Sequence, residues 1–369
     1  MKNYWEKMDF TQHYTKVSLR NIVIGLLLFL AAVILQILAR NKSGFADWYT
    51  ATIYATAEKW IGRVWGLFPF SVVELLLYGV LLWLSVAAGI GIFRITKKKR
   101  RPSDVLLAGG GNVLLFVGSL FFLYTTLCGI NYHSTPFSEK HGMEIKGYTV
   151  EELMSYCTMI TEEVNHLSDQ VNRELLKNQE QLGDKAVQAM EQLGKTYTGL
   201  SGYYPNPKPV LVSEILSYQQ LTGVYSPFTV EANYNADMTA YNIPFTMCHE
   251  LSHLRGFMRE DEANYIAYLA CSRSDALEFQ YSGALMAWIY STNLLWEYAP
   301  DIYEELQESL RLEVRKDLKE NTAFWDRYDG AVAKVADKVN DTYLKANKQT
   351  DGVESYDRMV DLLMADYLS

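Results

Sequence analysis

Two histidines and a glutamate in the motif His249-Glu250-Leu251-Ser252-His253 have the types and spacing needed to bind and use a metal ion. On a helix, residues four apart lie on the same face, so both imidazoles can bind one zinc ion. Glu250 then lies near the metal-bound water, where a carboxylate can act as general base. The pattern predicts a zinc-dependent hydrolase, and the alternative is a helix that carries two unrelated histidines.

The residues after the motif predict a turn and a second helix that returns to the metal. Gly256 can end the first helix in a left-handed conformation. The segment 259–268 then reads as a new helix, on which Glu260 and Asn264 stand four apart on one face while Glu262 points elsewhere. The turn allows this segment to offer a third ligand.

This arrangement resembles the gluzincin metallopeptidases, in particular the membrane-bound ones whose second helix carries Glu-x-x-Ala-Asp. The resemblance implies a zincin-like fold that binds zinc. The site residues that it implies are the zinc ligands His249, His253 and Glu260, the general base Glu250, and Asn264 as the residue that orients a ligand histidine. Asn264 stands where that family usually has Asp, and the gap between His253 and Glu260 is shorter. Glu262 therefore remains the rival third ligand.

The wider pattern is similar to a bacterial family of membrane proteins of unknown function, with three N-terminal spans followed by GVYSPFTVEANYN, IPFTMCHELSHLRGF and EDEANYIAYLAC. The resemblance to zincins implies that the strand at Thr229–Asn235 pairs with an extended peptide substrate, and packing within a sheet is the equal alternative. Tyr225 and Tyr356 are candidates for stabilising the oxyanion, and packed aromatic residues are the alternative.

Three strongly apolar segments near the N-terminus predict a membrane domain. They are assigned to residues 21–39, 71–95 and 105–128, each long enough as a helix to cross the hydrocarbon core of a bilayer. Glu74, at the start of the second span, is expected to reach the headgroups. Tryptophans and apolar residues at helical spacing over residues 46–66 predict a helix that lies on the membrane surface or packs against the soluble domain.

The distribution of charge predicts the orientation of the chain. The basic run at residues 97–101 lies between the second and third spans, and short loops rich in Lys and Arg stay in the cytoplasm. The N-terminus is then cytoplasmic too, and residues 131–369 lie outside the cytoplasm of a multi-pass protein of the cell membrane. Residues 131–369 carry 20 Lys and Arg against 37 Asp and Glu. Such an acidic domain repels phosphates, which excludes ordinary nucleic-acid binding.

Residues 131–369 predict a mainly helical α+β domain with one small sheet. A capping box at residues 149–152 opens an amphipathic helix that runs to residue 175. Segments rich in β-branched and aromatic residues, 209–213 and 225–235, predict strands just before the motif. The four cysteines are widely spaced without a CxxC pair, so neither a disulfide framework nor a cysteine zinc site is predicted.

The sequence thus predicts a membrane-anchored zinc metallopeptidase that acts on a peptide or protein. The alternative is a zinc-stabilised binding or regulatory membrane protein, in which the metal only joins two helices. A closed coordination sphere would favour this alternative, and an accessible groove beside residues 229–235 would favour the enzyme. A transport or sensor role finds little support, because the spans carry almost no polar residues.

Overall fold

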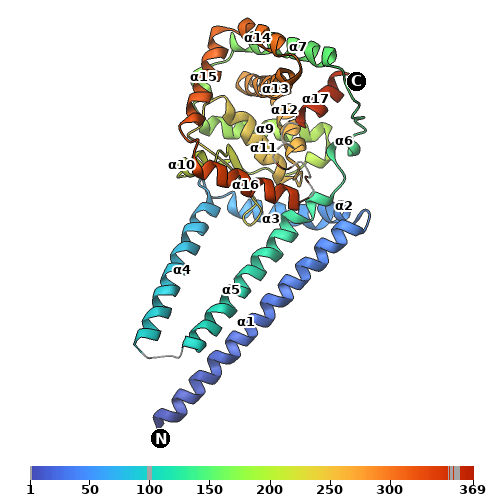
Figure 1. Cartoon of the computed structure of the whole chain (residues 1–369). Helices are drawn as coiled ribbons and strands as arrows, with labels where there is room; N and C mark the ends of the chain where they lie inside the picture. Colours follow the sequence, from blue (N-terminus) through green and yellow to red (C-terminus); the bar gives the residue numbers. More distant parts are fainter. Residues whose placement is uncertain (1, 98–101, 348, 350–351, 353–357) are drawn as a thin grey trace.

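The computed structural model consists of a helical body, residues 131–369, on a stalk of three long helices (Figure 1). It describes residues 2–97, 102–347, 349, 352 and 358–369. Tyr356 and residues 98–101 of the basic run lie outside the described residues. The N-terminus lies at the free end of the stalk and the C-terminus on the body (Figure 1).

The stalk has the length and composition of a membrane domain. Its helices are α1 (Lys2–Asn41), α4 (Val72–Thr96) and α5 (Pro102–Tyr124). The segments long and apolar enough to cross a membrane are Val17–Asn41, Val72–Thr96 and Val105–His133. They agree with the predicted spans to within a few residues. Most of their large apolar side chains are exposed, as lipid-facing surfaces require.

A helix with an internal π-helical turn joins α1 to α4 and lies across the base of the body (Figure 1). Its three segments are α2 (Phe45–Tyr49), the π-helical turn η1 (Thr50–Tyr54) and α3 (Ala55–Trp65). Tyr54 and Glu58 are buried, whereas Trp48 and Trp60 are 53% and 64% exposed. The helix predicted at residues 46–66 is therefore present, with its tryptophans outside the core.

Two buried glutamates fasten α4 to the body. Glu231 accepts hydrogen bonds from two backbone N–H groups at the N-terminus of α4, at 3.1 and 2.9 Å. Glu74 in turn accepts the backbone N–H groups of Leu211 and Val212, at 2.7 and 3.0 Å. Hydrogen bonds to an ionised carboxylate are among the stronger ones in proteins. The expectation that Glu74 reaches the headgroups is wrong, because its carboxylate binds the body.

The small sheet contains three strands in the order β1-β3-β2. These are β1 (Lys208–Pro209), β2 (Gly223–Ser226) and β3 (Glu231–Tyr234). β3 pairs in parallel with β1 and antiparallel with β2. Because β3 is paired on both sides, the peptide-binding edge predicted at Thr229–Asn235 is wrong, and β2 is the edge strand next to the motif.

The two predicted strand segments are only partly correct. Of residues 209–213, only Pro209 is in a strand, and the rest turn into the short helix α10 (Glu214–Tyr218). The segment 225–235 divides into two antiparallel strands after Ser226. Pro227 follows at the turn, where it interrupts no ladder hydrogen bond, and Val230 has a φ of 53°.

The helices of the body surround one large hydrophobic core, and a smaller cluster of buried residues lies where the base helix meets the body. The predicted capping box is present at Thr149 and Glu152, but the helix ends at Ser168 and not at residue 175, and Asn172 caps a new short helix. Before the motif the helical segments are η2 (Thr125–Gly129), η3 (Asn131–His133), α6 (Phe137–Lys140), α7 (Val150–Ser168), α8 (Arg173–Leu176), α9 (Gln179–Thr196) and η4 (Thr198–Leu200). From the motif on they are α11 (Asn242–Leu254), α12 (Glu260–Ser272), α13 (Leu277–Tyr298), α14 (Pro300–Ser309), α15 (Leu312–Asp326), α16 (Ala331–Ala346) and α17 (Met359–Tyr367).

The junction with α4 depends on a buried ion pair. Glu231 pairs with Lys208, and both side chains are less than 5% exposed. Glu231→Gln leaves Lys208 buried without its carboxylate, so we expect the free energy of unfolding to fall by about 3–5 kcal/mol. Denaturant unfolding in detergent micelles measures this loss. Glu313→Gln is the matched control, because the pair of Glu313 with Lys316 is exposed and contributes at most about 1 kcal/mol. Equal stability of the two variants would contradict the prediction.

Candidate metal centre

The motif lies on α11, all of whose residues are buried. The helix ends at Leu254, and Gly256 in the turn that follows has a φ of 90°; a Cβ there would lie 3.0 Å from Thr50 in η1. Glycine is therefore required both by the backbone conformation and by the close approach of η1. Tyr54 of the same turn donates a hydrogen bond to the Leu254 carbonyl at 3.0 Å, at the C-terminus of α11. The helix at the base thus fixes the end of the motif helix.

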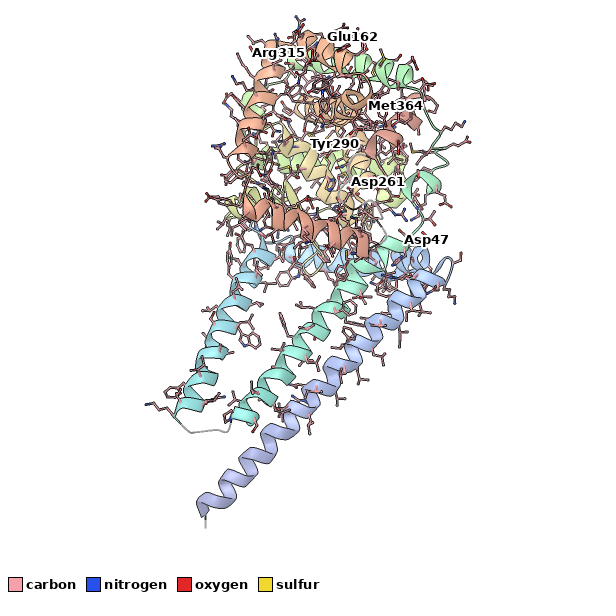
Figure 2. The ribbon with its side chains drawn as sticks, in the orientation of Figure 1. Asp47, Glu162, Asp261, Tyr290, Arg315 and Met364 are labelled. Carbon is pink, nitrogen blue, oxygen red and sulfur yellow. The ribbon has the colours of Figure 1, made fainter. Side chains whose placement is uncertain are left out.

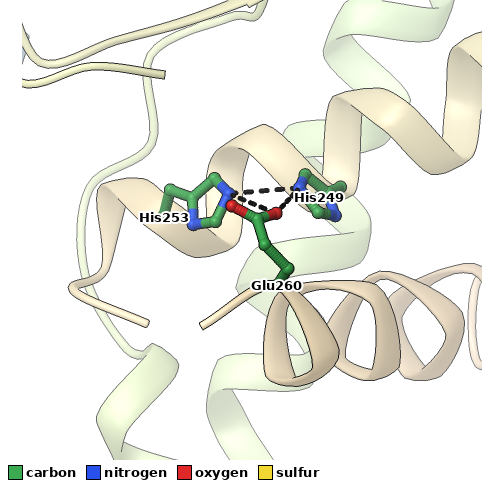
Figure 3. A group of neighbouring side chains, drawn as sticks. All are labelled: His249, His253 and Glu260. Carbon is green, nitrogen blue, oxygen red and sulfur yellow. Dashed lines mark hydrogen bonds and ion pairs between the residues drawn. The ribbon is translucent and has the colours of Figure 1, made fainter. Parts of the chain in front are cut away.

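Figure 3 shows His249, His253 and Glu260 converging between α11 and α12. The Nε2 atoms of the two histidines are 3.1 Å apart. Glu260 Oε2 lies 3.2 Å from Nε2 of His249 and 3.6 Å from Nε2 of His253. All three residues are buried. The two histidines and Glu260 are therefore brought together by the turn at Gly256.

The second ring nitrogen of each histidine fixes its tautomer. His253 Nδ1 lies 2.8 Å from the Phe257 carbonyl oxygen, which can only accept a hydrogen bond. His249 Nδ1 lies 2.7 Å from Asn264 Oδ1, at the position expected for the orienting residue. In the neutral imidazoles both Nδ1 atoms therefore carry hydrogen, and both Nε2 lone pairs point at Glu260.

These atoms form a site that requires a positive charge. Two lone pairs and a carboxylate repel one another unless a proton or a cation lies between them. Burial alone would lower the pKa of His253, but the Glu260 carboxylate raises it to about 9. Nitrogen and oxygen ligands about 2.0–2.1 Å from a tetrahedral ion are about 3.3 Å apart, which is close to the separations found here. The three residues could therefore hold a small divalent metal ion.

Glu250 lies beside this group in the same cavity. Burial raises its pKa to about 7, against the opposing effect of the two histidines. Within the described residues, its Oε2 has no hydrogen-bond partner. A Cβ at Gly223 would overlap its Oε1, so the carboxylate fits against the bare backbone of β2. Glu250 is thus a buried carboxylate with one oxygen that accepts no hydrogen bond from the part of the chain that the structure describes.

The cavity has a volume of about 550 Å³ and takes its walls from distant parts of the chain. Cys128 and Tyr132 come from the end of the third apolar segment, and Tyr290 comes from α13, near the middle of the body in Figure 2. Asn340 and Tyr343 come from α16. Sequence reasoning missed these residues, because no local pattern links them to the motif.

The rival third ligand and the candidates for stabilising the oxyanion do not join this group of side chains. Glu262 accepts hydrogen bonds from the backbone N–H of Phe137 at 2.8 Å and from Arg259 at 3.0 Å, so its carboxylate is already bound outside the group. Tyr225 lines the cavity, with its hydroxyl 3.0 Å from that of Tyr54. Because Tyr54 donates to a backbone carbonyl, Tyr225 donates to Tyr54 and not into the cavity. The other oxyanion candidate, Tyr356, lies outside the described residues.

Metal analysis of purified variants tests the third ligand. We expect Glu260→Gln to lose the bound metal, because a neutral amide removes the negative charge between the two histidines. Glu262→Gln, a buried change on the same helix, should keep the metal and serves as control. The measurement is metal content per chain by mass spectrometry after dialysis. Loss of metal from Glu262→Gln alone would contradict the assignment.

The comparisons with known proteins identify a family without an assigned role. Neither the curated proteins nor the solved structures include a significant match to this chain. One family model, described as a protein of unknown function (DUF3810), matches residues 49–364. The match includes most of the helix at the base, two helices of the stalk and the complete candidate metal centre. The chain therefore belongs to the DUF3810 family.

Proposed function

We propose that this protein is a membrane-anchored, zinc-dependent metallopeptidase. The observation that carries the proposal is the convergence of His249, His253 and Glu260 beside the buried carboxylate of Glu250 in one cavity. Among the described residues, one oxygen of this carboxylate has no hydrogen-bond partner. Two histidines and one carboxylate are a ligand set of catalytic zinc sites, which keep a coordination position open. These features support a hydrolytic site over two unrelated histidines on a helix.

The roles of the protein groups follow from their positions. When bound, a zinc ion would lower the pKa of water towards about 7 and polarise the carbonyl of the substrate. Glu250 would accept the proton of the attacking water and then donate it to the leaving amine. Asn264 and the Phe257 carbonyl keep the two imidazoles oriented.

The edge strand β2 is the best candidate for binding the substrate. Gly223, Val224 and Tyr225 of β2 line the cavity, and β3 occupies only one side of the strand. An extended peptide that pairs with the free side of β2 would pass the Glu250 carboxylate, which lies against Gly223. This assignment replaces the edge that was expected at residues 229–235.

The site supports an enzyme better than a purely structural metal centre. A structural zinc site is normally closed by four protein ligands, whereas the described residues bring together three potential ligands next to a cavity. The positive charge of residues 97–101 supports a cytoplasmic loop at that end of the stalk. The body and its cavity would then act outside the cytoplasm on peptides or proteins.

Glu250→Gln separates metal binding from catalysis. We expect zinc content to remain unchanged and cleavage of a peptide library to fall by about 10²–10⁴-fold, because the amide cannot accept the proton. Glu262→Gln is the matched control and should retain activity. If Glu250→Gln cleaves as well as the wild-type chain, the assigned base is wrong. If the wild-type chain binds zinc but cleaves nothing, the regulatory alternative holds.

Gly223→Ala tests the position of the base without changing any charged group. The added Cβ would overlap the Glu250 carboxylate and lie 2.9 Å from the Asn233 carbonyl oxygen, so the carboxylate must move. A displacement of about 1 Å can cost about a hundredfold in rate, and we expect such a loss of kcat with full zinc content. Gly79→Ala is the control, because a Cβ there meets no atom within 4 Å. Full activity of Gly223→Ala would contradict the prediction.

A further inference from the structure

The amphipathic helix α16 lies along the base of the body, at the level where α4 and α5 meet it (Figure 1). Its C-terminal end is held by the stalk. The Tyr343 hydroxyl lies 3.2 Å from that of Tyr132, and Tyr124 donates to Asn347 Oδ1 at 2.8 Å. Arg40 of α1 donates to the carbonyl oxygen of Ala346 at 3.3 Å. The helix is therefore fixed at the height at which the membrane-length helices end.

One face of α16 forms a wall of the metal cavity. Asp337, Asn340 and Tyr343, spaced three residues apart, line the cavity. Ala333 and Leu344 of α16 are buried. The helix therefore covers the cavity from the side of the stalk.

The neighbouring face of α16, which adjoins the cavity-lining face at Tyr343, carries an exposed apolar stripe. Val332, Val335 and Val339 follow the i, i+3, i+7 spacing of one helical face and are 54%, 64% and 63% exposed. Lys334 and Lys338, four residues apart, are exposed on the flank of this stripe. A face of valines beside lysines is typical of helices that lie in the plane of a membrane surface.

We propose that α16 binds the surface of a lipid bilayer through Val332, Val335 and Val339. Lys334 and Lys338 then lie next to anionic headgroups. The three helices of the stalk place a bilayer at the base of the body, where α16 lies, and the positive charge of the two lysines complements phosphate. The bilayer thereby holds one wall of the metal cavity in place.

Lipid quenching of a label on α16 tests this contact in the full chain. The variant Val335→Cys is labelled with an environment-sensitive fluorophore, since the four native cysteines are buried. The protein is placed in nanodiscs of phosphatidylcholine and phosphatidylglycerol that contain doxyl-labelled lipid. Leu312→Cys is the control, because Leu312 is 59% exposed at the start of α15, far from the stalk (Figure 1). An unchanged unfolding midpoint shows that each labelled chain is folded.

We expect a blue-shifted emission at position 335 and loss of most of the fluorescence to the lipid quencher, with neither effect at position 312. Equal, weak quenching at both positions would overturn the proposal. A blue shift without lipid quenching that disappears on dilution would also overturn it, because a second copy of the chain would then cover the valines.

The lysines are tested separately with Lys334→Gln combined with Lys338→Gln. Quenching at position 335 should weaken when phosphatidylglycerol is omitted, and the double variant should show no such dependence. The two proteins, with and without the lysine substitutions, are each compared in nanodiscs with and without phosphatidylglycerol. Equal quenching in all four samples would overturn the role of the lysines. None of these results depends on hydrolysis, so a chain that shows the lipid contact and cleaves no peptide refutes only the proposed function.

Discussion

The structure around the candidate metal centre depends on one constraint: three atoms with lone pairs must be held close together in the body. His249 Nε2, His253 Nε2 and Glu260 Oε2 lie 3.1–3.6 Å apart, although groups of this kind repel one another without a positive charge between them. The protein holds them there with a hydrogen bond to each outer ring nitrogen and with the sharp turn at Gly256. The fold therefore holds these three groups close together despite their mutual repulsion, and a bound cation would remove that repulsion.

The helices at the base do more than hold the body at a surface. Tyr54 binds the last carbonyl of the motif helix, and Glu58, which is 1% exposed, pairs with Arg255 just after it. Cys128 and Tyr132 extend the third apolar segment into the cavity wall. The position of the candidate metal centre is therefore set jointly by the body and by the helices that lead into it.

The features that the sequence predicted well are local ones. The spacing of His249 and His253, and that of Glu260 and Asn264, depends only on the helical repeat, which is why these pairs lie as expected. The choice between Glu260 and Glu262 depends on the geometry of one turn, which spacing does not determine. The free edge of the sheet at Thr229–Asn235 and the contacts of Glu74 were predicted wrongly, because they depend on residues far away in the chain. The walls from α16 and α13 were missed for the same reason.

The origin of the cavity walls affects how the chain can be divided. Hydropathy suggests dividing the chain at residue 130, and the candidate metal ligands His249, His253 and Glu260 would all stay on the C-terminal fragment. Such a fragment would lose Cys128 from the cavity wall, the hydrogen bond of Tyr54 to the end of α11 and the ion pair of Glu58 with Arg255. A C-terminal fragment fused to another membrane anchor would therefore carry only part of the cavity and of the contacts that hold α11.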